Sequence, residues 1–389
     1  MQKSIKLIRV TTVPLSLKYL LRGQMKYMAT KGINVIMVSS DGIEIDDVKN
    51  FENVPHILIP MTRQITPWQD IKSIILLYRL FKKEKPDIVH SHTPKAGLTA
   101  MLAAKLSGVP LRIHTIAGLR FFTTSGFKRK LLIQMEKLTS WAATQVWPNS
   151  FSMYTYLLKH SIGNKEKLSV IGRGSSNGID LSIYNHQNID EHRIAFIKEK
   201  IKFQAGDLVF VFVGRIVADK GVNELVEAFV QIHEKCPQVK LLLVGTFENA
   251  LDPILPETES VIRNHPCVQV TGWVDDVQNY LALATALIHP SLREGFPNVL
   301  LQAGAIHCPI ICSKIDGNTD IVSDKKTGLL FEPNNAKSLI ERWEYAISHR
   351  EEMNSWADNL QNEVRDEYSR DRLHEQIFKA YKTILQNNK

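Results

Sequence analysis

Short apolar runs alternate with longer helical segments along most of the sequence. In the first half, runs typical of buried strands occupy residues 5–12, 33–40, 54–61, 87–92, 111–118 and 145–149. Segments 68–83 and 127–143 lie between such runs and are typical of helices. In 68–83 the apolar residues that recur at helical spacing are Ile71, Ile74, Ile75, Tyr78 and Phe81, which predicts a helix of a soluble core. Strands that alternate with helices predict parallel sheets covered on both faces.

The alternation stops and restarts once. Residues 172–204 are first rich in Gly, Ser and Asn and then polar, and a strand-like run resumes at 208–213. Further strands are expected at 240–245, 268–272, 286–289 and 309–313, and the last forty or so residues predict helix alone. We therefore expect an α/β protein of two Rossmann-like βα-repeat domains, residues 1–180 and 181–389, with the final helix packing back on the first domain.

Length and charge agree with two domains. A chain of 389 residues with 23% charged and 44% hydrophobic residues is an ordinary globular protein, neither disordered nor fibrous. Residues 1–180 contain 26 Lys and Arg against 11 Asp and Glu, a net charge of +15, whereas residues 181–389 contain 22 against 29, a net of −7. This step favours two domains over one large α/β unit, and it indicates a polyanionic partner for the first half.

Several classes of protein are not supported by the sequence. Its four cysteines form no Cys-x-x-Cys pair, so we expect reduced thiols in a cytosolic protein rather than zinc ligands or disulfides. No apolar run approaches the ~18 residues of a membrane span. Lys3, Lys6 and Arg9 interrupt the N-terminal apolar stretch, which therefore reads as a first strand and not as a signal peptide.

The first segment that carries chemistry is Val-Gly-Arg-Ile-Val-Ala-Asp-Lys-Gly at 213–221, between a predicted strand and a predicted helix. Gly214 allows a bound group to approach the backbone closely. Arg215 and Lys220 flank a loop that leads into a helix N-terminus, a favourable place for phosphate. Taken singly they are two solvated basic residues; the order of strand, Gly-Arg, loop, Lys-Gly and helix is what favours a phosphate site.

The second segment, 289–304, consists of a buried strand, a loop and a helix. Pro297 suits the first turn of that helix, and Asn298 and Gln302 share one of its faces. The loop and the helix dipole would face an anion at the carboxyl ends of the strands. A carboxylate beside an anion is unfavourable unless it binds hydroxyls, so Glu294 suggests a sugar next to the phosphates. The alternative is a carboxylate that complements the helix dipole.

The two segments, about 80 residues apart, resemble the donor site of the family 4 retaining glycosyltransferases, whose GT-B fold has two Rossmann-like domains facing a central cleft. Residues 210–221 resemble the family's Gly-Arg-x4-Lys-Gly signature and residues 294–302 its Glu-x7-Glu signature. Residues 177–180, 271–273, 316–318 and 327–330 match in style and place. The resemblance is weaker in the first domain, where His-Thr-Pro-Lys-Ala-Gly at 92–97 is similar to bacterial enzymes that build surface polysaccharides or lipid-linked oligosaccharides.

The resemblance implies a catalytic set in which Arg215 and Lys220 hold the donor diphosphate and Glu294 contacts sugar hydroxyls. The other donor-binding residues it implies are Gly214, Thr271, Gly272, Trp273, Gly295, Phe296, Pro297, Asn298, Val299 and Gln302. On the acceptor side it points to Pro14, His92, Lys95, His114 and Arg173. No cofactor and no metal are expected, because two positive side chains and helix dipoles can stabilise a leaving diphosphate.

Three positions depart from the family pattern. Gln302 replaces the second acid of Glu-x7-Glu, so its bonds to ribose hydroxyls lack charge assistance. Ala117 stands where many members have a histidine after the fifth strand. His114 precedes it by three residues, faces the opposite side of the strand and reads better as a half-buried strand histidine. Val13-Pro14-Leu15-Ser16 replaces the usual glycine pair of the first loop.

The expected reaction is transfer of a sugar from a nucleotide-diphosphate donor to a lipid-linked saccharide, with retention of anomeric configuration. The donor favoured by similarity is a UDP-N-acetylhexosamine or UDP-hexose. Alternatives are a nucleotide-sugar epimerase of the same fold and a nucleic-acid binder, although no nucleic-acid-binding motif is visible. His90 and His92 share one strand face and could suggest a metal, but strand-end hydrogen bonding is the better interpretation without a third ligand.

The excess positive charge of the first domain favours an anionic membrane. Residues 82–137 carry 11 Lys and Arg against 3 Asp and Glu. Lys128-Arg129-Lys130 follow Phe121, Phe122 and Phe127 and predict an aromatic and basic element for an anionic surface or a lipid diphosphate. We therefore expect a cytoplasmic protein that is peripheral on the inner face of the cell membrane.

Overall fold

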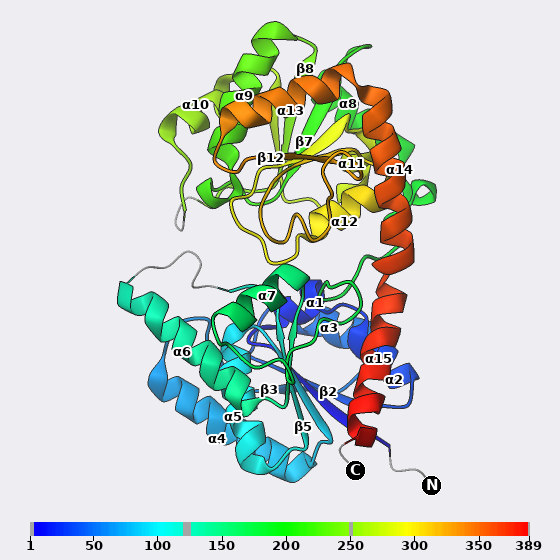
Figure 1. Ribbon diagram of the computed structural model, residues 1–389. Coiled ribbons are helices and arrows are strands. Elements are labelled where there is room, and N and C mark those ends of the chain that lie inside the picture. The colour runs from blue at the N-terminus through cyan, green and yellow to red at the C-terminus, as the bar shows by residue number, and fades with distance from the viewer. Residues whose placement is uncertain (1–3, 120–125, 249–251, 388–389) are drawn as a thin grey trace. The chain divides into compact units, whose positions relative to one another are not determined.

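The structure is a computed structural model that describes residues 4–119, 126–248 and 252–387. The chain divides into two compact units (Figure 1). The first comprises residues 1–178 and 370–389, and the second residues 179–369. The change from the first unit to the second thus falls two residues before the expected position 180, and the last helix belongs to the first unit.

The first unit alternates strands and helices and then receives the C-terminal helix. Its elements are β1 (Lys6–Val10), α1 (Pro14–Leu20), α2 (Gln24–Thr30), β2 (Asn34–Ser39), α3 (Ile45–Glu52), β3 (His56–Leu58), α4 (Pro67–Glu84), β4 (Ile88–His92), α5 (Pro94–Ser107), β5 (Leu111–Ile116), α6 (Gly126–Ala142), β6 (Gln145–Pro148), α7 (Phe151–Lys159) and α15 (Arg370–Asn387).

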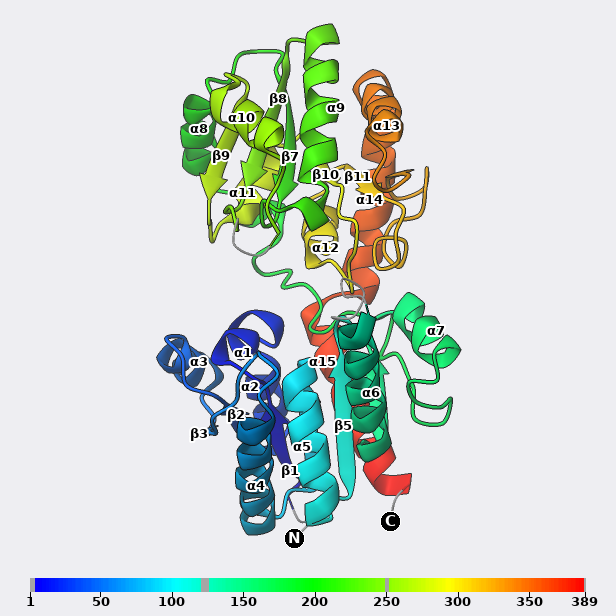
Figure 2. The ribbon, with the colours of Figure 1, turned by 90° about the vertical axis from the view of Figure 1, so that its left-hand side faces the viewer.

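The described strands of this unit form one parallel sheet in the order β3-β2-β1-β4-β5-β6. Successive side chains of a strand point to opposite faces, which divides the core in two. Ile8 and Val10 pack with α4, α5 and α6, the layer seen in front of the sheet in Figure 2. Leu7 points to the other face, where α1, α2 and α15 cover the sheet.

Helix α4 confirms the predicted helix but corrects its orientation. Its buried residues are Ser73, Leu77 and Phe81, whereas Ile71, Ile75 and Tyr78 are exposed. The apolar residues of this helix therefore occupy two faces, and only one of them packs on the core. Periodicity finds such a helix, but it does not tell which apolar face is covered.

The second unit repeats the architecture. Its elements are η2 (His186–Asn188), α8 (Glu191–Lys200), β7 (Leu208–Val213), η3 (Ala218–Lys220), α9 (Val222–Lys235), β8 (Val239–Val244), α10 (Pro256–Asn264), β9 (Val268–Gly272), α11 (Val277–Leu283), β10 (Ala286–His289), α12 (Asn298–Ala305), β11 (Ile310–Ser313), β12 (Leu329–Phe331), α13 (Ala336–Ser348) and α14 (Arg350–Glu367).

Its described strands also form a parallel sheet, in the order β12-β11-β10-β7-β8-β9. Phe210 and Phe212 point to the face covered by α9 and α13, and Phe210 lies against Trp343, with ring centroids 4.8 Å apart. Val209 and Val211 point to the other face, toward α8 and α11. Both sheets thus have the strand order 3-2-1-4-5-6 of a doubly wound fold, which confirms the predicted α/β class with two Rossmann-like domains.

Candidate active site

The predicted donor residues of the second unit gather where its strand order reverses. The sheet grows in opposite directions from β7 and β10, and in doubly wound folds ligands bind outside the carboxyl ends of strands at this point. Gly214 and Arg215 directly follow β7, and the loop after β10 carries Glu294. The topology therefore brings together two segments that are far apart in sequence.

Lys220 and Glu294 meet in this region. The Nζ atom of Lys220 lies 2.5 Å from Oε1 of Glu294, and Nε2 of His289 lies 3.1 Å from the same oxygen. The Lys220 and Glu294 side chains are only 18% and 15% exposed. Burial alone would raise the pKa of Glu294, but the contact with His289 and the charge of Lys220 outweigh it and hold that pKa well below its usual value. Glu294 is therefore ionised at neutral pH.

Gly221 lets the two loops approach each other closely. Its φ is +70°, and a Cβ atom there would overlap the carbonyl oxygen of Pro290. Asp219 adds two links: its carbonyl oxygen accepts a hydrogen bond from the Leu292 N–H at 2.9 Å, and its carboxylate pairs with Arg293 at 2.5 Å. These contacts fix η3 beside the loop after β10 and so place Lys220 next to Glu294.

Arg215 is turned toward a different partner. Its Nη1 atom lies 2.8 Å from Oε2 of Glu248, which follows β8, and both side chains are partly exposed. The guanidinium therefore stands at the edge of the site, with its charge balanced by Glu248. Sequence patterns did not indicate Glu248, because its position beside Arg215 depends on the adjacency of β7 and β8.

The loop and helix after Glu294 have mixed roles. Asn298 is the first residue of α12, directly after Pro297. Gln302 donates a hydrogen bond from Nε2 to the Tyr184 hydroxyl at 2.8 Å. Phe296 is buried against Tyr368, with ring centroids 5.8 Å apart, so its side chain belongs to the core. Gly295 precedes Phe296, and Val299, in the first turn of α12, packs partly buried against the same core.

The other predicted donor residues lie at the end of β9. The Thr271 hydroxyl donates to the Gly272 carbonyl oxygen at 2.8 Å. Trp273 is 66% exposed, and its indole N–H donates to Asp275 at 3.2 Å. Thr271, Gly272 and Trp273 thus place an exposed aromatic surface at the end of β9.

The predicted acceptor residues of the first unit separate into different environments. Pro14 is buried at the start of α1, and Arg173 is exposed. Lys95 is buried and paired with Asp70 of α4, with Nζ and Oδ2 2.5 Å apart. His114 is buried against Gly97 on the face opposite to His90 and His92, and it bonds the Ser91 hydroxyl at 2.9 Å. Of the five, His92 lines a pocket.

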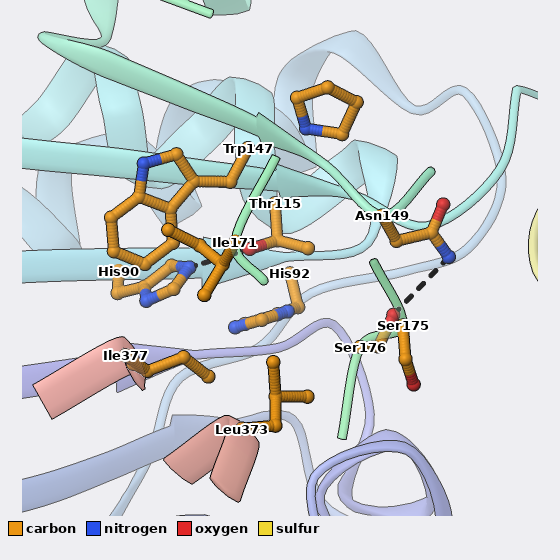
Figure 3. Close-up of a pocket in the computed structure, with 11 residues that line it drawn as sticks. His90, His92, Thr115, Trp147, Asn149, Ile171, Ser175, Ser176, Leu373 and Ile377 are labelled. Atoms are coloured by element: carbon orange, nitrogen blue, oxygen red, sulfur yellow. Dashed lines mark hydrogen bonds between the residues drawn. The ribbon is translucent and has the colours of Figure 1, made fainter. Parts of the chain in front are cut away.

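This pocket lies at the carboxyl ends of β4, β5 and β6, beside the point where the first sheet reverses its strand order. Its lining residues are His90, His92, Thr115, Trp147, Pro148, Asn149, Ile171, Ser175, Ser176, Leu373 and Ile377 (Figure 3). The sequence predicted His90 and His92 as hydrogen-bonded strand-end residues, with His92 on the acceptor side, but did not indicate Trp147, Asn149 or the buried Arg9. A charged residue inside the apolar run 7–10 was the available signal for Arg9.

Two further observations bear on the sequence expectations. Among the residues that the structure describes, no three His, Cys, Asp or Glu side chains are grouped in a way that could hold a metal ion. In the same residues, no helix combines the length and apolarity required to cross a membrane. Lys128, Arg129 and Lys130 begin α6, whereas Phe121 and Phe122 lie outside the described residues.

Two doubly wound domains, with paired cationic and carboxylate groups at the switch point of the second, are typical of the GT-B glycosyltransferases. The comparisons agree. Residues 193–363 match the family model "Glycosyl transferases group 1", and residues 13–150 match "Glycosyl transferase 4-like". The chain is 34% identical to the capsular polysaccharide biosynthesis glycosyltransferase CapM of Staphylococcus aureus over 99% of both chains. The protein belongs to the family 4 glycosyltransferases of bacterial surface-polysaccharide assembly.

Other similarities are more distant. The chain is 29% identical to an Escherichia coli UDP-Gal:alpha-D-GlcNAc-diphosphoundecaprenol alpha-1,3-galactosyltransferase over 80% of each chain. Among solved structures, Anabaena HepE in complex with UDP and glucose superposes with a TM-score of 0.82 at 17% identity, covering 97% of this chain and all of that one. A Rickettsia africae glycosyltransferase superposes with a TM-score of 0.81 at 19% identity, covering 99% of this chain and 100% of that one. These structures confirm the GT-B fold.

Proposed function

We propose that the protein transfers a sugar from a UDP-sugar, an N-acetylhexosamine or a hexose, to a saccharide carried on a lipid diphosphate, with retention of configuration. The observation that carries this proposal is the Lys220–Glu294 pair at the β7/β10 switch point, with Arg215 at its edge. The names of two relatives support the acceptor, since the E. coli enzyme and a Campylobacter jejuni enzyme both act on diphospho-undecaprenol saccharides.

The residues have separate roles in the proposed reaction. Lys220 and Arg215 stabilise the negative charge that develops on the leaving diphosphate, and Glu294 accepts hydrogen bonds from sugar hydroxyls. The positive charges of Lys220 and Arg215, with the N-terminus of α12, take the place of a metal ion. We therefore expect turnover to persist in EDTA. The exposed ring of Trp273, with Thr271 and Gly272, offers a surface on which the nucleobase of the donor can stack. The neutral amide of Gln302 hydrogen-bonds the ribose hydroxyls of the donor.

Retention follows if the leaving phosphate itself accepts the proton of the acceptor hydroxyl on the face that it vacates. The new glycosidic bond forms on the same face as the broken one, and the proton ends on the diphosphate. Glu294 is unsuited to be the base because its pKa lies far below neutrality and Lys220 and His289 already engage it. The anomeric configuration of the product, read by NMR, tests this step.

The test of the donor site begins with binding. Purified protein is screened by thermal shift with UDP, GDP and ADP, and the nucleotide that raises the melting temperature is used for titration. We expect Lys220→Ala to weaken UDP binding and turnover at least tenfold, or about 1.4 kcal/mol. Lys235→Ala is the matched control, because Lys235 is also ion-paired in the second unit but lies on its surface beside Glu344. A loss smaller than tenfold, or equal losses in both variants, contradicts the assignment.

We further propose that the first unit docks on an anionic membrane through the exposed face of α4. Trp68, Ile71, Ile75 and Tyr78 form an apolar stripe on this helix, and Trp68 is 86% exposed. Lys72, Arg79, Lys82 and Lys83 are exposed on the same helix. Apolar side chains beside basic ones are typical of helices that lie in an anionic interface.

Vesicle sedimentation tests the membrane surface. The protein should bind vesicles that contain phosphatidylglycerol and be released in 1 M salt, since the charge contribution is screened. Trp68→Ser should weaken binding several-fold. Ile43→Ser is the control, because Ile43 is 97% exposed in the same unit but lies outside α4. Binding that survives 1 M salt, or equal effects of both variants, argues against this surface.

A further inference from the structure

The first unit buries an arginine that forms no ion pair with any carboxylate of the described residues. Arg9 of β1 is fully buried, next to His90 in the adjacent strand. Its Nη1 lies 2.9 Å from His90 Nδ1 and 2.5 Å from His92 Nε2, and its Nη2 donates to the Tyr381 hydroxyl at 3.0 Å. Within the described parts of the chain, no carboxylate forms an ion pair with it. The charge of Glu52 raises the pKa of Arg9 slightly, but the two side chains are too far apart to form an ion pair.

The groups around Arg9 are neutral. Burial, together with the charge of Arg9, lowers the pKa values of His90 and His92 well below their usual range. Burial raises the pKa of Tyr381 to about 12. The cluster therefore keeps a net charge of +1 at neutral pH. A buried charge without a counter-ion is costly, and such groups are normally paired.

The arginine fixes the tautomers of both histidines. A guanidinium can only donate, so His90 Nδ1 and His92 Nε2 must accept. The remaining protons are then on His90 Nε2, which donates to the Thr115 hydroxyl at 2.7 Å, and on His92 Nδ1. His92 is 1% exposed, and its Nδ1 has no hydrogen-bond partner. The charge of Arg9 thus polarises a buried N–H donor that nothing in the described chain satisfies.

This donor lies in the pocket described above. The His92 ring lies between His90 and the serines Ser175 and Ser176 (Figure 3). The pocket is narrow: its volume of about 20 Å³ has room for about one water molecule or one oxygen atom of a ligand, and Asn149 and Thr115 add polar groups to its wall. Thr93 and Ser175 flank it with φ values of +74° and +78°, which side chains rarely adopt. Strain of this kind persists where the surroundings enforce one arrangement.

We infer that the pocket receives one oxygen of a phosphoryl group, bound by the His92 Nδ1–H with Arg9 supplying the compensating charge through the imidazole. An anionic oxygen would satisfy the free donor and balance the +1 charge together. The inference rests on the proposed function in one respect: the phosphoryl group it would hold belongs to the lipid-diphosphate acceptor. Arg9 acts here as a positioning residue, since it reaches the ligand only through His92.

The test separates this subsite from the donor site by keeping the enzyme saturated with UDP. Isothermal titration with inorganic pyrophosphate should then show one further binding event. His92→Gln should weaken it at least tenfold. His56→Gln is the matched control, because His56 is also a strand histidine with an unpartnered Nδ1 but has neither Arg9 nor the pocket beside it. No binding to the UDP-saturated wild type, or equal binding by His92→Gln, overturns the inference.

Arg9 is tested with two variants of the whole chain, and circular dichroism reports whether each one folds. Arg9→Lys keeps the charge and should retain part of the pyrophosphate affinity, whereas Arg9→Met should lose it. Equal pyrophosphate affinities of the two folded variants would overturn the role of the Arg9 charge. If Arg9→Met does not fold, the pyrophosphate affinity of His92→Gln decides whether the subsite exists.

The source of the phosphoryl group is decided by kinetics with undecaprenyl-diphosphate-linked N-acetylglucosamine. His92→Gln should raise the KM for this lipid at least tenfold and leave the KM for the donor unchanged. An unchanged lipid KM, despite weaker pyrophosphate binding, would show a site for free phosphate and overturn the acceptor assignment. If the wild type transfers no sugar to any lipid, the proposed function fails, while the pyrophosphate titration still judges the subsite.

Discussion

Gly97 of α5 faces the buried ring of His114. A Cβ atom on Gly97 would lie 2.8 Å from both ring nitrogens of His114 and closer still to Cε1, whereas ordinary contacts begin near 3.4 Å. The ring cannot shift freely because its Nδ1 bonds the Ser91 hydroxyl at 2.9 Å. Gly97→Ala should therefore destabilise the first unit, although glycine-to-alanine changes inside helices normally stabilise.

The magnitude follows from three contributions. Overpacking of a core costs about 1–3 kcal/mol, and loss of the Ser91 hydrogen bond about 1 kcal/mol. The gain in helix propensity offsets about 1 kcal/mol. We expect a net destabilisation of about 1–3 kcal/mol from these contributions. Urea unfolding of the whole chain, fitted with a transition for each unit, measures it as a lower midpoint of the first unit.

A double-mutant cycle isolates the contact. In a His114→Ala background the ring is absent, so Gly97→Ala should become stabilising by about 0.5–1 kcal/mol. The change of sign is the diagnostic result, because a general defect of α5 would persist in that background. Stabilisation of the first unit by Gly97→Ala alone, or the same effect in both backgrounds, would show that the His114 ring does not clash with a side chain at position 97.

Three further outcomes are expected. The pKa of Glu294 is lowered in the fold, so its stabilising contribution is complete above the ordinary glutamate pKa of about 4.3 and is lost as pH falls below it. The urea midpoint of the second unit should drop between pH 5 and 3 less steeply in Glu294→Gln than in wild type. Burial raises the pKa of Glu136 to about 7, so the folded state keeps a proton that the unfolded chain has released, and stability falls as pH rises from about 4.3 to 7. Glu136→Gln should melt at higher temperature than wild type at pH 8 but not at pH 4; equal differences at both pH values would exclude this cause. Cys308 and Cys312 are buried, and burial raises the pKa of Cys308 to about 12. N-ethylmaleimide should label Cys236 and Cys267 first in the native protein, as mass spectrometry would show, and early modification of Cys308 would contradict the packing.

Much of the fold could be predicted because central strands of a doubly wound sheet are buried on both faces. Such strands are continuous apolar runs, and the runs at 208–213 and 286–289 coincide with β7 and β10. The two shortest edge strands, β3 and β12, carry a weaker signal. The run at 54–61 yields only the three residues of β3, and β12 was not expected at all. Three residues provide too little alternation to be recognised.

The site was predictable where a motif is local and not where the contact depends on the fold. The segment 213–221 indicated Lys220, and Glu294 was found from its own loop, but their 2.5 Å contact needs β7 and β10 to be neighbours. Tyr381 reaches Arg9 from a helix 372 positions later in the chain. No local pattern relates these two residues. Arg9 is a charged residue within an apolar strand, but its sequence neighbourhood alone did not indicate a functional role.

The two switch points differ in how their cations are balanced. In the second unit Lys220 pairs with Glu294 and Arg215 with Glu248, so a phosphate that approaches either cation competes with a carboxylate. In the first unit Arg9 is surrounded by neutral imidazoles and a phenol, so a phosphate at His92 displaces no carboxylate in the described chain. The uneven distribution of charge in the sequence thus has a local counterpart. In the proposed donor site of the acidic half an anion would bind by exchange of ion pairs, whereas in the proposed subsite of the basic half it would meet a cation that no carboxylate of the described residues pairs with.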